Sequence, residues 1–278
     1  MLNLHPDNMA GSPANGLTAY IEGIGLLGPG LANWPSSRAI LTGGQPYQPE
    51  RTVIPAPELL PPAERRRASA IVKLTLATSL EAIAQAKLQD ASLPSVFSFS
   101  NGDGVNCHSI CEMLASDDRQ ISPTRFHNSV HNAAAGYWSI ATGTMATSSV
   151  LCAYDASFGA GLLDAITQVV VDDTRCILMA SDTDYLEPMR SKRPIPDNFG
   201  ISLVLAPQRS RQSIAQIKVS ICHDQPYQFY DNDLEALRLA IPAARGLPLL
   251  RSIAQQKAGL VVLDYLDETR LCIEISPC

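Results

Sequence analysis

The segment SSVLCAYDASFGAGLLDAI, residues 148–166, places a short apolar strand pattern directly before a helical one. Residues 148–153 favour a strand, and helical periodicity continues from Ala156 to about Val170. Asp155 lies between them, at a sharp strand-to-helix turn of the kind that exposes the nucleophile in many enzymes. A side chain at such a turn meets the positive end of the helix dipole, which stabilises an anion. This segment therefore predicts an α/β fold with a functional position at Asp155.

The rest of the chain also alternates strand and helix patterns. Apolar residues between Ala68 and Ala86 recur at helical spacing, and residues 96–99 form a strand pattern that ends in a glycine-containing turn. Because strands alternate with helices, we expect an α/β class with a mixed sheet. Further helices are expected at 106–114, 133–140, 232–240 and 247–255, and further strands at 19–25, 175–180, 201–206, 214–222, 259–265 and 270–275.

The composition limits the classes of function. The 278 residues are 46% apolar and 17% charged, so a large core can form and intrinsic disorder is disfavoured. The net charge of -6 and the pI of about 5.3 argue against nucleic-acid binding through bulk electrostatics. No apolar run approaches the roughly 18 uncharged residues of a membrane span. Residues 1–16 lack the basic and apolar regions of a secretory signal, so we expect a flexible N-terminus and a cytoplasmic protein.

The cysteines and histidines form no metal-binding pattern along the sequence. Cys107 and Cys111 are four residues apart, with His108 beside them, and His127 and His131 have the same spacing. Neither group offers enough ligands for a metal site. In a cytoplasmic protein the seven cysteines are expected to be reduced. The sequence thus predicts buried thiols, no metal and no cofactor.

Three segments around the predicted turn keep a fixed spacing. They are RQISP at 119–123, HNAAAGYWSI at 131–140 and ILMASDTD at 177–184. These segments resemble the R-x-I-S-P, I-N-x-A-A-G-H-L-S-I and V-F-A-G-G-G-E-E motifs in the N-terminal half of the β-ketoacyl synthases of the thiolase superfamily. Counted without a gap, the family's T-A-C-x-S motif falls on residues 153–157. Asp155 therefore stands where the family has its catalytic cysteine.

Two weaker motifs extend this resemblance to about residues 17–222. EGIG at 22–25 resembles the family's opening T-G-x-G strand, and NFGISLVL at 198–205 resembles its later G-x-G-A-x-x-L-V-L segment. The resemblance implies a thiolase-like α/β fold with a mixed five-stranded sheet and packed helices, whose second half is strongly reduced. We accordingly expect a single truncated domain over residues 17–278, with a short C-terminal remnant at 223–278.

Two departures from the family bear on function. An aspartate at the nucleophile position cannot perform transacylation, because a thiolate is what attacks an acyl thioester. The family's second half carries two catalytic histidines, one in an H-G-T-x-T motif, whereas here only His223 follows, in the unrelated context CHD. The resemblance therefore implies a catalytically inactive subunit, a chain length factor. Such a subunit pairs with an active β-ketoacyl-ACP synthase and shapes its acyl tunnel in fatty acid, polyketide or aryl polyene biosynthesis.

The resemblance also implies partners and contact residues. The active synthase would form a heterodimer with this chain, which in isolation would form a homodimer, and the acyl carrier protein would be reached through the partner. An apolar strand edge near residues 148–154 would be a liability for a monomer, which also favours a dimer. The residues expected at the tunnel or interface are Phe126 (above all), His127, Val130, His131, Tyr137, Trp138, Cys152, Tyr154, Asp155 and Phe158.

Other interpretations stay open at this point. Asp155 could cap its helix, mimic a bound carboxylate or take part in chemistry. Cys152 is a candidate displaced nucleophile, although no histidine partner is identifiable from the sequence. The chain could act alone as a malonyl decarboxylase, since that step needs only a stabilised enolate, or as an acyltransferase whose Cys152 accepts acyl groups. It could also serve as a homodimeric scaffold that binds acyl chains or carrier protein. The basic run at 65–67 is either solvated or docks an acidic carrier protein.

Overall fold

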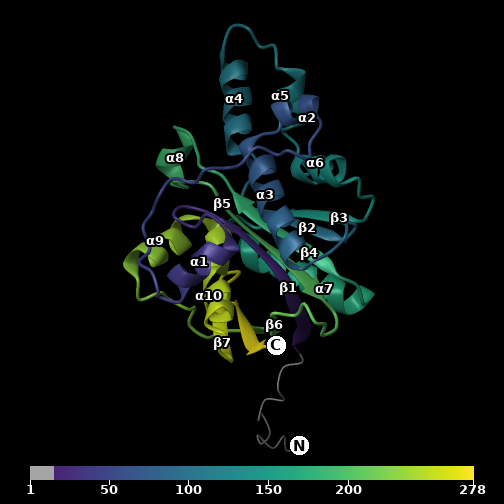
Figure 1. Cartoon of the computed structure of the whole chain (residues 1–278). Coiled ribbons are helices and arrows are strands. Elements are labelled where there is room, and N and C mark those ends of the chain that lie inside the picture. Colours follow the sequence, from purple (N-terminus) through teal and green to yellow (C-terminus); the bar gives the residue numbers. More distant parts are fainter. Residues whose placement is uncertain (1–15) are drawn as a thin grey trace, which may run out of the picture.

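A computed structural model describes residues 16–278 (Figure 1). Residues 1–15, which hold nearly all of the segment expected to be flexible, lie outside the described residues. The described chain forms one sheet of eight strands in the order β3-β2-β4-β5-β1-β6-β8-β7. Within residues 16–278, every helix is too short or too polar to cross a membrane.

The elements expected from the sequence are present, with small differences at their ends. The strands are β1 (Leu17–Leu27), β2 (Ser95–Phe99), β3 (Ser148–Cys152), β4 (Cys176–Asp182), β5 (Phe199–Ala206), β6 (Ala215–Cys222), β7 (Gly259–Asp264) and β8 (Arg270–Pro277). The helices are α1 (Trp34–Leu41), α2 (Pro62–Arg67), α3 (Ala70–Gln85), α4 (Gly104–Ala115), α5 (Pro123–His127), α6 (Ala133–Thr142), α7 (Ser157–Asp172), α8 (Met189–Lys192), α9 (Asn232–Ala240) and α10 (Leu247–Gln255). Two short 3-10 helices are η1 (Tyr154–Ala156) and η2 (Pro242–Gly246).

The expectation of five strands was wrong, because the C-terminal part of the chain extends the same sheet. Strand β1 is long enough to pair with β5 through residues 20–27 and with β6 through residues 17–21. Strands β8 and β7 then follow β6 in antiparallel pairs. Strands β1 to β5 are therefore continued in the same sheet by β6, β8 and β7.

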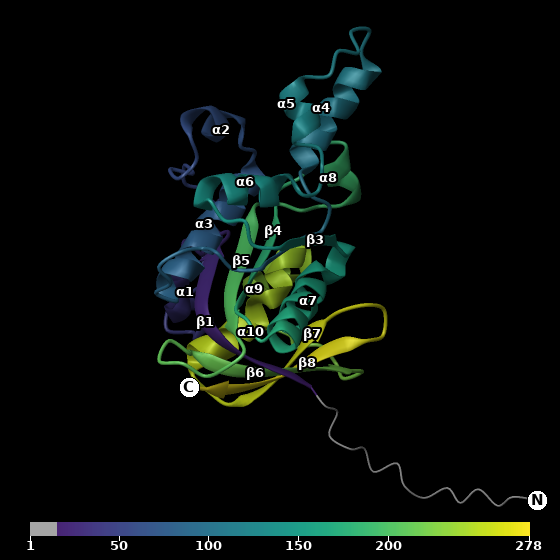
Figure 2. The ribbon, with the colours of Figure 1, turned by 90° about the vertical axis from the view of Figure 1, so that its right-hand side faces the viewer.

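Two hydrophobic cores lie on opposite faces of the central strands, which are buried on both sides. Figure 2 shows α3 and α6 on one face and α7 with α10 on the other. Side chains alternate between the two cores along β4, so that Ile177 and Met179 face α3 and α6 while Leu178 and Ala180 face α7. This layering explains why β4 and β5 are continuous apolar runs in the sequence.

Near the end of β1, side chains of α3 accept backbone hydrogen bonds that a neighbouring strand would otherwise accept. The backbone N–H groups of Ile24 and Leu26 donate to the side chains of Gln85 and Glu81, and Glu81 also accepts from the N–H of Trp34 at 2.8 Å. These contacts require a close helix-to-strand approach, which Gly25 permits because it has no Cβ. Side chains of α3 thus satisfy backbone donors that would otherwise be buried without partners.

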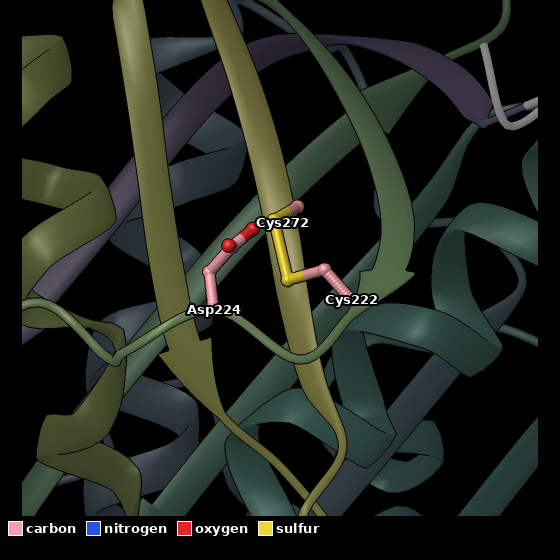
Figure 3. Close-up of side chains that lie close together, drawn as sticks. All are labelled: Cys222, Asp224 and Cys272. Carbon is pink, nitrogen blue, oxygen red and sulfur yellow. Dashed lines mark hydrogen bonds between the residues drawn. A yellow bond between two sulfur atoms is a disulfide. The ribbon is translucent and has the colours of Figure 1, made fainter. Parts of the chain in front are cut away.

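The expectation that all cysteines are reduced was wrong for one pair. Cys222 at the end of β6 and Cys272 in β8 form a disulfide (Figure 3). The antiparallel register of β6 and β8 brings these two residues together although 50 positions separate them in the sequence. No local cysteine spacing could reveal this pairing. The other cysteines are free, and only Cys176 among them is buried.

Candidate functional site

The strand-to-helix turn predicted at residues 152–157 is present and tightly held. Tyr154 has a φ of 53°, in the left-handed region that bulky residues rarely adopt. The Ser157 hydroxyl accepts a hydrogen bond from the N–H of Ala153 and lies within donating distance of the carbonyl oxygens of Phe99 and Tyr154. The strained turn is therefore tied to the end of the neighbouring strand β2.

The Asp155 carboxylate is held by two arginines. Its Oδ1 lies 2.7 Å from Nη2 of Arg193, and its Oδ2 lies 3.4 Å from Nη2 of Arg245 in η2. The guanidinium of Arg193 also stacks over the ring of Tyr154, 3.5 Å from the ring centroid. Asp155 does not cap α7, because the N-cap residue is Ala156 and no side chain caps it. Its carboxylate instead joins the turn to the α8 loop and to η2.

A thiol and an imidazole meet beside this turn. Sγ of Cys152 lies 3.5 Å from Nδ1 of His131, which precedes α6. The sequence offered no sign of this partner, because 21 residues separate the two positions. Burial raises the pKa of the Cys152 thiol above its ordinary value, and the nearby Asp182 carboxylate raises it further. The surroundings therefore favour a neutral thiol over a nucleophilic thiolate.

Asp182, at the end of β4, is a buried carboxylate that links three segments. Its Oδ1 accepts from the N–H of Ser100 and its Oδ2 from the N–H of Ala243, both at 2.8 Å. Burial raises the pKa of Asp182 from 3.8 to about 6 against the lowering effect of these hydrogen bonds. In the sequence this residue stands only within the segment at 177–184, whose pattern indicates no role for it.

This raised pKa predicts a measurable pH dependence of folding. The folded chain binds a proton at Asp182 more tightly than the unfolded chain does. The stability contributed by this proton is therefore full below about pH 4 and is lost as the pH rises through about 6, by roughly 3 kcal/mol in all. We expect the free energy of unfolding of Asp182→Asn, measured in urea between pH 4 and 7, to lack this decline relative to the unmodified protein. Parallel curves for both proteins would show that Asp182 does not titrate in this range.

An arm projects from the body close to the turn. We define the arm as residues 104–130, which include α4 and α5 (Figures 1 and 2). A cavity of about 470 Å³ lies between the arm and α6. Its lining includes the apolar side chains of Ile110, Leu114, Ile121, Phe126 and Val130. His131 lines it as well and connects the cavity to Cys152.

Residues 38–256 match the family model described as the N-terminal domain of beta-ketoacyl synthase. This chain belongs to the β-ketoacyl synthase family. No curated protein matches its sequence significantly. Its fold is nevertheless shared by many solved structures, three of which are informative here.

The first of these similar structures is the ketosynthase ApeO in complex with its chain length factor ApeC from Xenorhabdus doucetiae. The TM-score is 0.69 at 18% identity, over 93% of this family member and 99% of that chain. For the ishigamide ketosynthase/chain length factor, the TM-score is 0.67 at 13% identity. The alignment covers 94% of this chain and 99% of that chain. The third structure is AntDE:AntF, a type II PKS acyl-carrier protein in complex with its ketosynthase. Its TM-score is 0.70 at 9% identity, and the alignment covers 95% of this chain and 100% of that chain. These alignments cover both chains almost fully, so the matched chains are about as short as this one.

The contact residues expected from the sequence fall into four sets in the structure. Phe126, Val130 and His131 line the cavity, and Cys152, Tyr154 and Asp155 form the turn. His127 is exposed, and its ring lies edge-on to that of Tyr137. Three aromatic side chains of the expected set are packed in the core of the chain. They are Tyr137, Trp138 and Phe158.

Several charged residues of this site could not be found by sequence reasoning. Arg193 and Arg245 carry no motif and are distant from Asp155 along the chain. The basic run that was considered as a docking site is largely satisfied within the chain. Arg65 pairs with Glu58 at 2.7 Å and Arg67 with Glu64 at 3.1 Å, which favours the solvated interpretation.

Proposed function

We propose that this chain is the non-catalytic subunit, of the chain length factor type, in a ketosynthase heterodimer. It pairs with an active β-ketoacyl-ACP synthase and shapes that partner's acyl tunnel in fatty acid, polyketide or aryl polyene biosynthesis. The observation that carries this proposal is the environment of Asp155, whose carboxylate binds Arg193 and Arg245. By motif resemblance this residue falls at the family's nucleophile position. The similar folds in complexes of ketosynthases with chain length factors support it.

The chemistry available at the turn supports a non-catalytic role. Condensation needs a thiolate that accepts the acyl group and a base that assists it. Asp155 offers a weakly nucleophilic carboxylate already paired with two cations, and no histidine among residues 16–278 hydrogen-bonds to it. His223 lies instead beside the carbonyl oxygen of Glu268, at 3.2 Å, in the loop between β7 and β8. Acyl transfer in the complex is therefore assigned to the partner, to which the carrier protein delivers its substrate.

The face around β3 has the properties of a partner surface. Strand β3 is at the edge of the sheet, where its outer backbone groups have no strand partner among the described residues, and its side chains are only partly buried. The arm beside it exposes large apolar side chains, with Phe126 68% and Val130 52% exposed. Because His131 contacts both the cavity and the end of β3, the apolar surface and the strand edge form one continuous face. A surface of this kind favours protein association.

The exposure of Phe126 supports a role for this residue in limiting chain length. Its ring is exposed on the arm and lines the cavity opposite α6. A bulky side chain at the end of a partner's tunnel would stop a growing acyl chain by steric exclusion. Replacement by alanine would leave space for additional carbon units without removing backbone contacts.

The proposal is tested by reconstitution with the synthase that co-purifies with the tagged chain from its native cell. We expect a stoichiometric ketosynthase in the pull-down, identified by mass. We then expect the Phe126→Ala complex to make longer products from malonyl-carrier protein than the unmodified complex, at a similar rate of condensation. Leu260→Ala, in β7 at the opposite edge of the sheet, is the matched control and should leave product length unchanged. Absence of any ketosynthase from the pull-down would remove the basis of the proposal.

The contact between Cys152 and His131 favours a second candidate, an acyltransferase or malonyl decarboxylase that acts alone. Incubation of the isolated chain with malonyl-carrier protein separates the two functions. Because the pKa of Cys152 is raised, we expect no carbon dioxide and no acyl adduct on Cys152 in the intact mass. Release of carbon dioxide that Cys152→Ser abolishes would instead establish the stand-alone enzyme. A chain that remains a homodimer in the presence of the synthase would favour the scaffold function.

A further inference from the structure

A cluster of potential metal ligands lies far from the turn in sequence, at the end of β6. Cys222 ends β6, Asp224 follows in the next loop, and Cys272 faces both from β8 (Figure 3). One ligand atom from each residue lies within 4.8 Å of the other two. No metal site was expected from the sequence, in which too few ligands lie close together, and 48 residues separate Asp224 from Cys272.

The position of Asp224 is not explained by the disulfide alone. Its Oδ2 lies 3.5 Å from Sγ of Cys272, although a disulfide sulfur carries no proton to donate. No cation pairs with this carboxylate among the ion pairs of residues 16–278. In a tetrahedral zinc site with Zn–S of about 2.3 Å and Zn–O of about 2.0 Å, a thiolate sulfur and a carboxylate oxygen are about 3.5 Å apart. Asp224 therefore lies within reach of an ion that the reduced sulfurs of this pair could share.

We propose that reduced Cys222 and Cys272 bind one Zn²⁺ together with Asp224, and that oxidation to the disulfide releases the ion. On binding, each thiol loses a proton and becomes a thiolate ligand, and water occupies the fourth position. On oxidation by hydrogen peroxide, the two thiolates form the S–S bond, and the peroxide takes up two electrons and two protons to give two molecules of water. The two forms are mutually exclusive because they use the same sulfur atoms.

The strand pairing prepares this site before any ligand binds. Eight consecutive residue pairs connect β6 with β8, and the Cα atoms of Cys222 and Cys272 are 5.8 Å apart. After reduction, rotation about the Cα–Cβ bonds can separate the sulfur atoms to the roughly 3.8 Å that two zinc-bound thiolates require. Cys272 is buried and Asp224 is exposed, so the ion can enter from the solvent side.

A metal ion or a disulfide here would clamp the strands that support the charged network around Asp155. Arg270, two residues before Cys272, approaches Asp264 of β7 at 4.0 Å. Asp264 in turn lies 3.9 Å from Arg245, which pairs with Asp155. The proposed site is thus structural, and it does not depend on whether the chain forms a heterodimer.

The test is a Co²⁺ titration of the full chain after reduction with a phosphine and removal of metal. We expect thiolate-to-cobalt charge-transfer absorption that saturates at about one ion per chain and disappears when Zn²⁺ displaces Co²⁺. Hydrogen peroxide should release the ion, as detected with a chromogenic chelator. The double variant Cys107→Ser/Cys111→Ser is the control for the other close cysteine pair and should bind as the unmodified chain does.

Two further variants decide whether these residues are the ligands. Cys272→Ser should abolish the charge-transfer band, with folding checked by circular dichroism. Asp224→Asn changes only an exposed side chain and should weaken binding at least about tenfold. The proposal is overturned if the reduced chain gives no thiolate charge-transfer band, or if Asp224→Asn binds Co²⁺ as tightly as the unmodified chain.

Discussion

Val130→Glu is expected to lower the affinity for the proposed ketosynthase partner by at least about 100-fold. Val130 is half exposed on the arm and lines the apolar cavity, so the free chain tolerates a charge there. In the complex, the glutamate would be buried against an apolar surface without a cation. An unpaired buried charge costs several kcal/mol, of which about 3 kcal/mol already corresponds to 100-fold in affinity. Size-exclusion chromatography and co-purification measure the loss.

The matched control for this variant is Leu260→Glu. Leu260 is exposed to a similar extent, but it lies in β7 at the opposite edge of the sheet. We expect Leu260→Glu to retain the partner and both variants to keep the melting temperature of the unmodified chain. If Val130→Glu still forms the complex, or if both variants lose it equally, the arm is not the partner surface.

Gly25→Ala is expected to reduce the free energy of unfolding by more than about 3 kcal/mol. A Cβ at this position would overlap the carbonyl oxygen of Thr78, which is backbone and cannot rotate away. Helix α3 would have to lift from β1, which would also weaken the hydrogen bonds that Glu81 accepts from Leu26 and Trp34. Because domains are stable by only about 5–15 kcal/mol, a loss of this size removes a large share of the free energy of unfolding.

Gly136→Ala offers the corresponding control, measured by urea unfolding with circular dichroism. Gly136 lies within α6, and an added Cβ would meet nothing within 4 Å. Alanine favours a helix over glycine by about 1 kcal/mol, so this variant should be as stable as the unmodified chain or slightly more stable. Equal destabilisation by both substitutions would contradict the close approach of α3 to β1.

Much of the local structure follows from residue patterns along the chain. The strand at residues 148–153 and the helix after Asp155 were predictable because apolar periodicity reports which face of an element is buried. Strands at 259–265 and 270–275 were predicted as elements, but their place in the sheet was not. Their place in the sheet depends on the pairing of β6 with the second edge of β1. No local pattern in the sequence specifies which strands become neighbours.

The composition of the functional site was decided by contacts between distant segments. The sequence alone placed Asp155 at the family's nucleophile position, at the start of a helix. It could not reveal that Arg193, 38 residues away, would bind that carboxylate, or that His131 would meet Cys152. Nor could it bring Cys222 and Cys272 together across 50 residues. Such pairs form only when strand pairing and helix packing fix the backbone, because side chains contact one another through space and not through sequence separation.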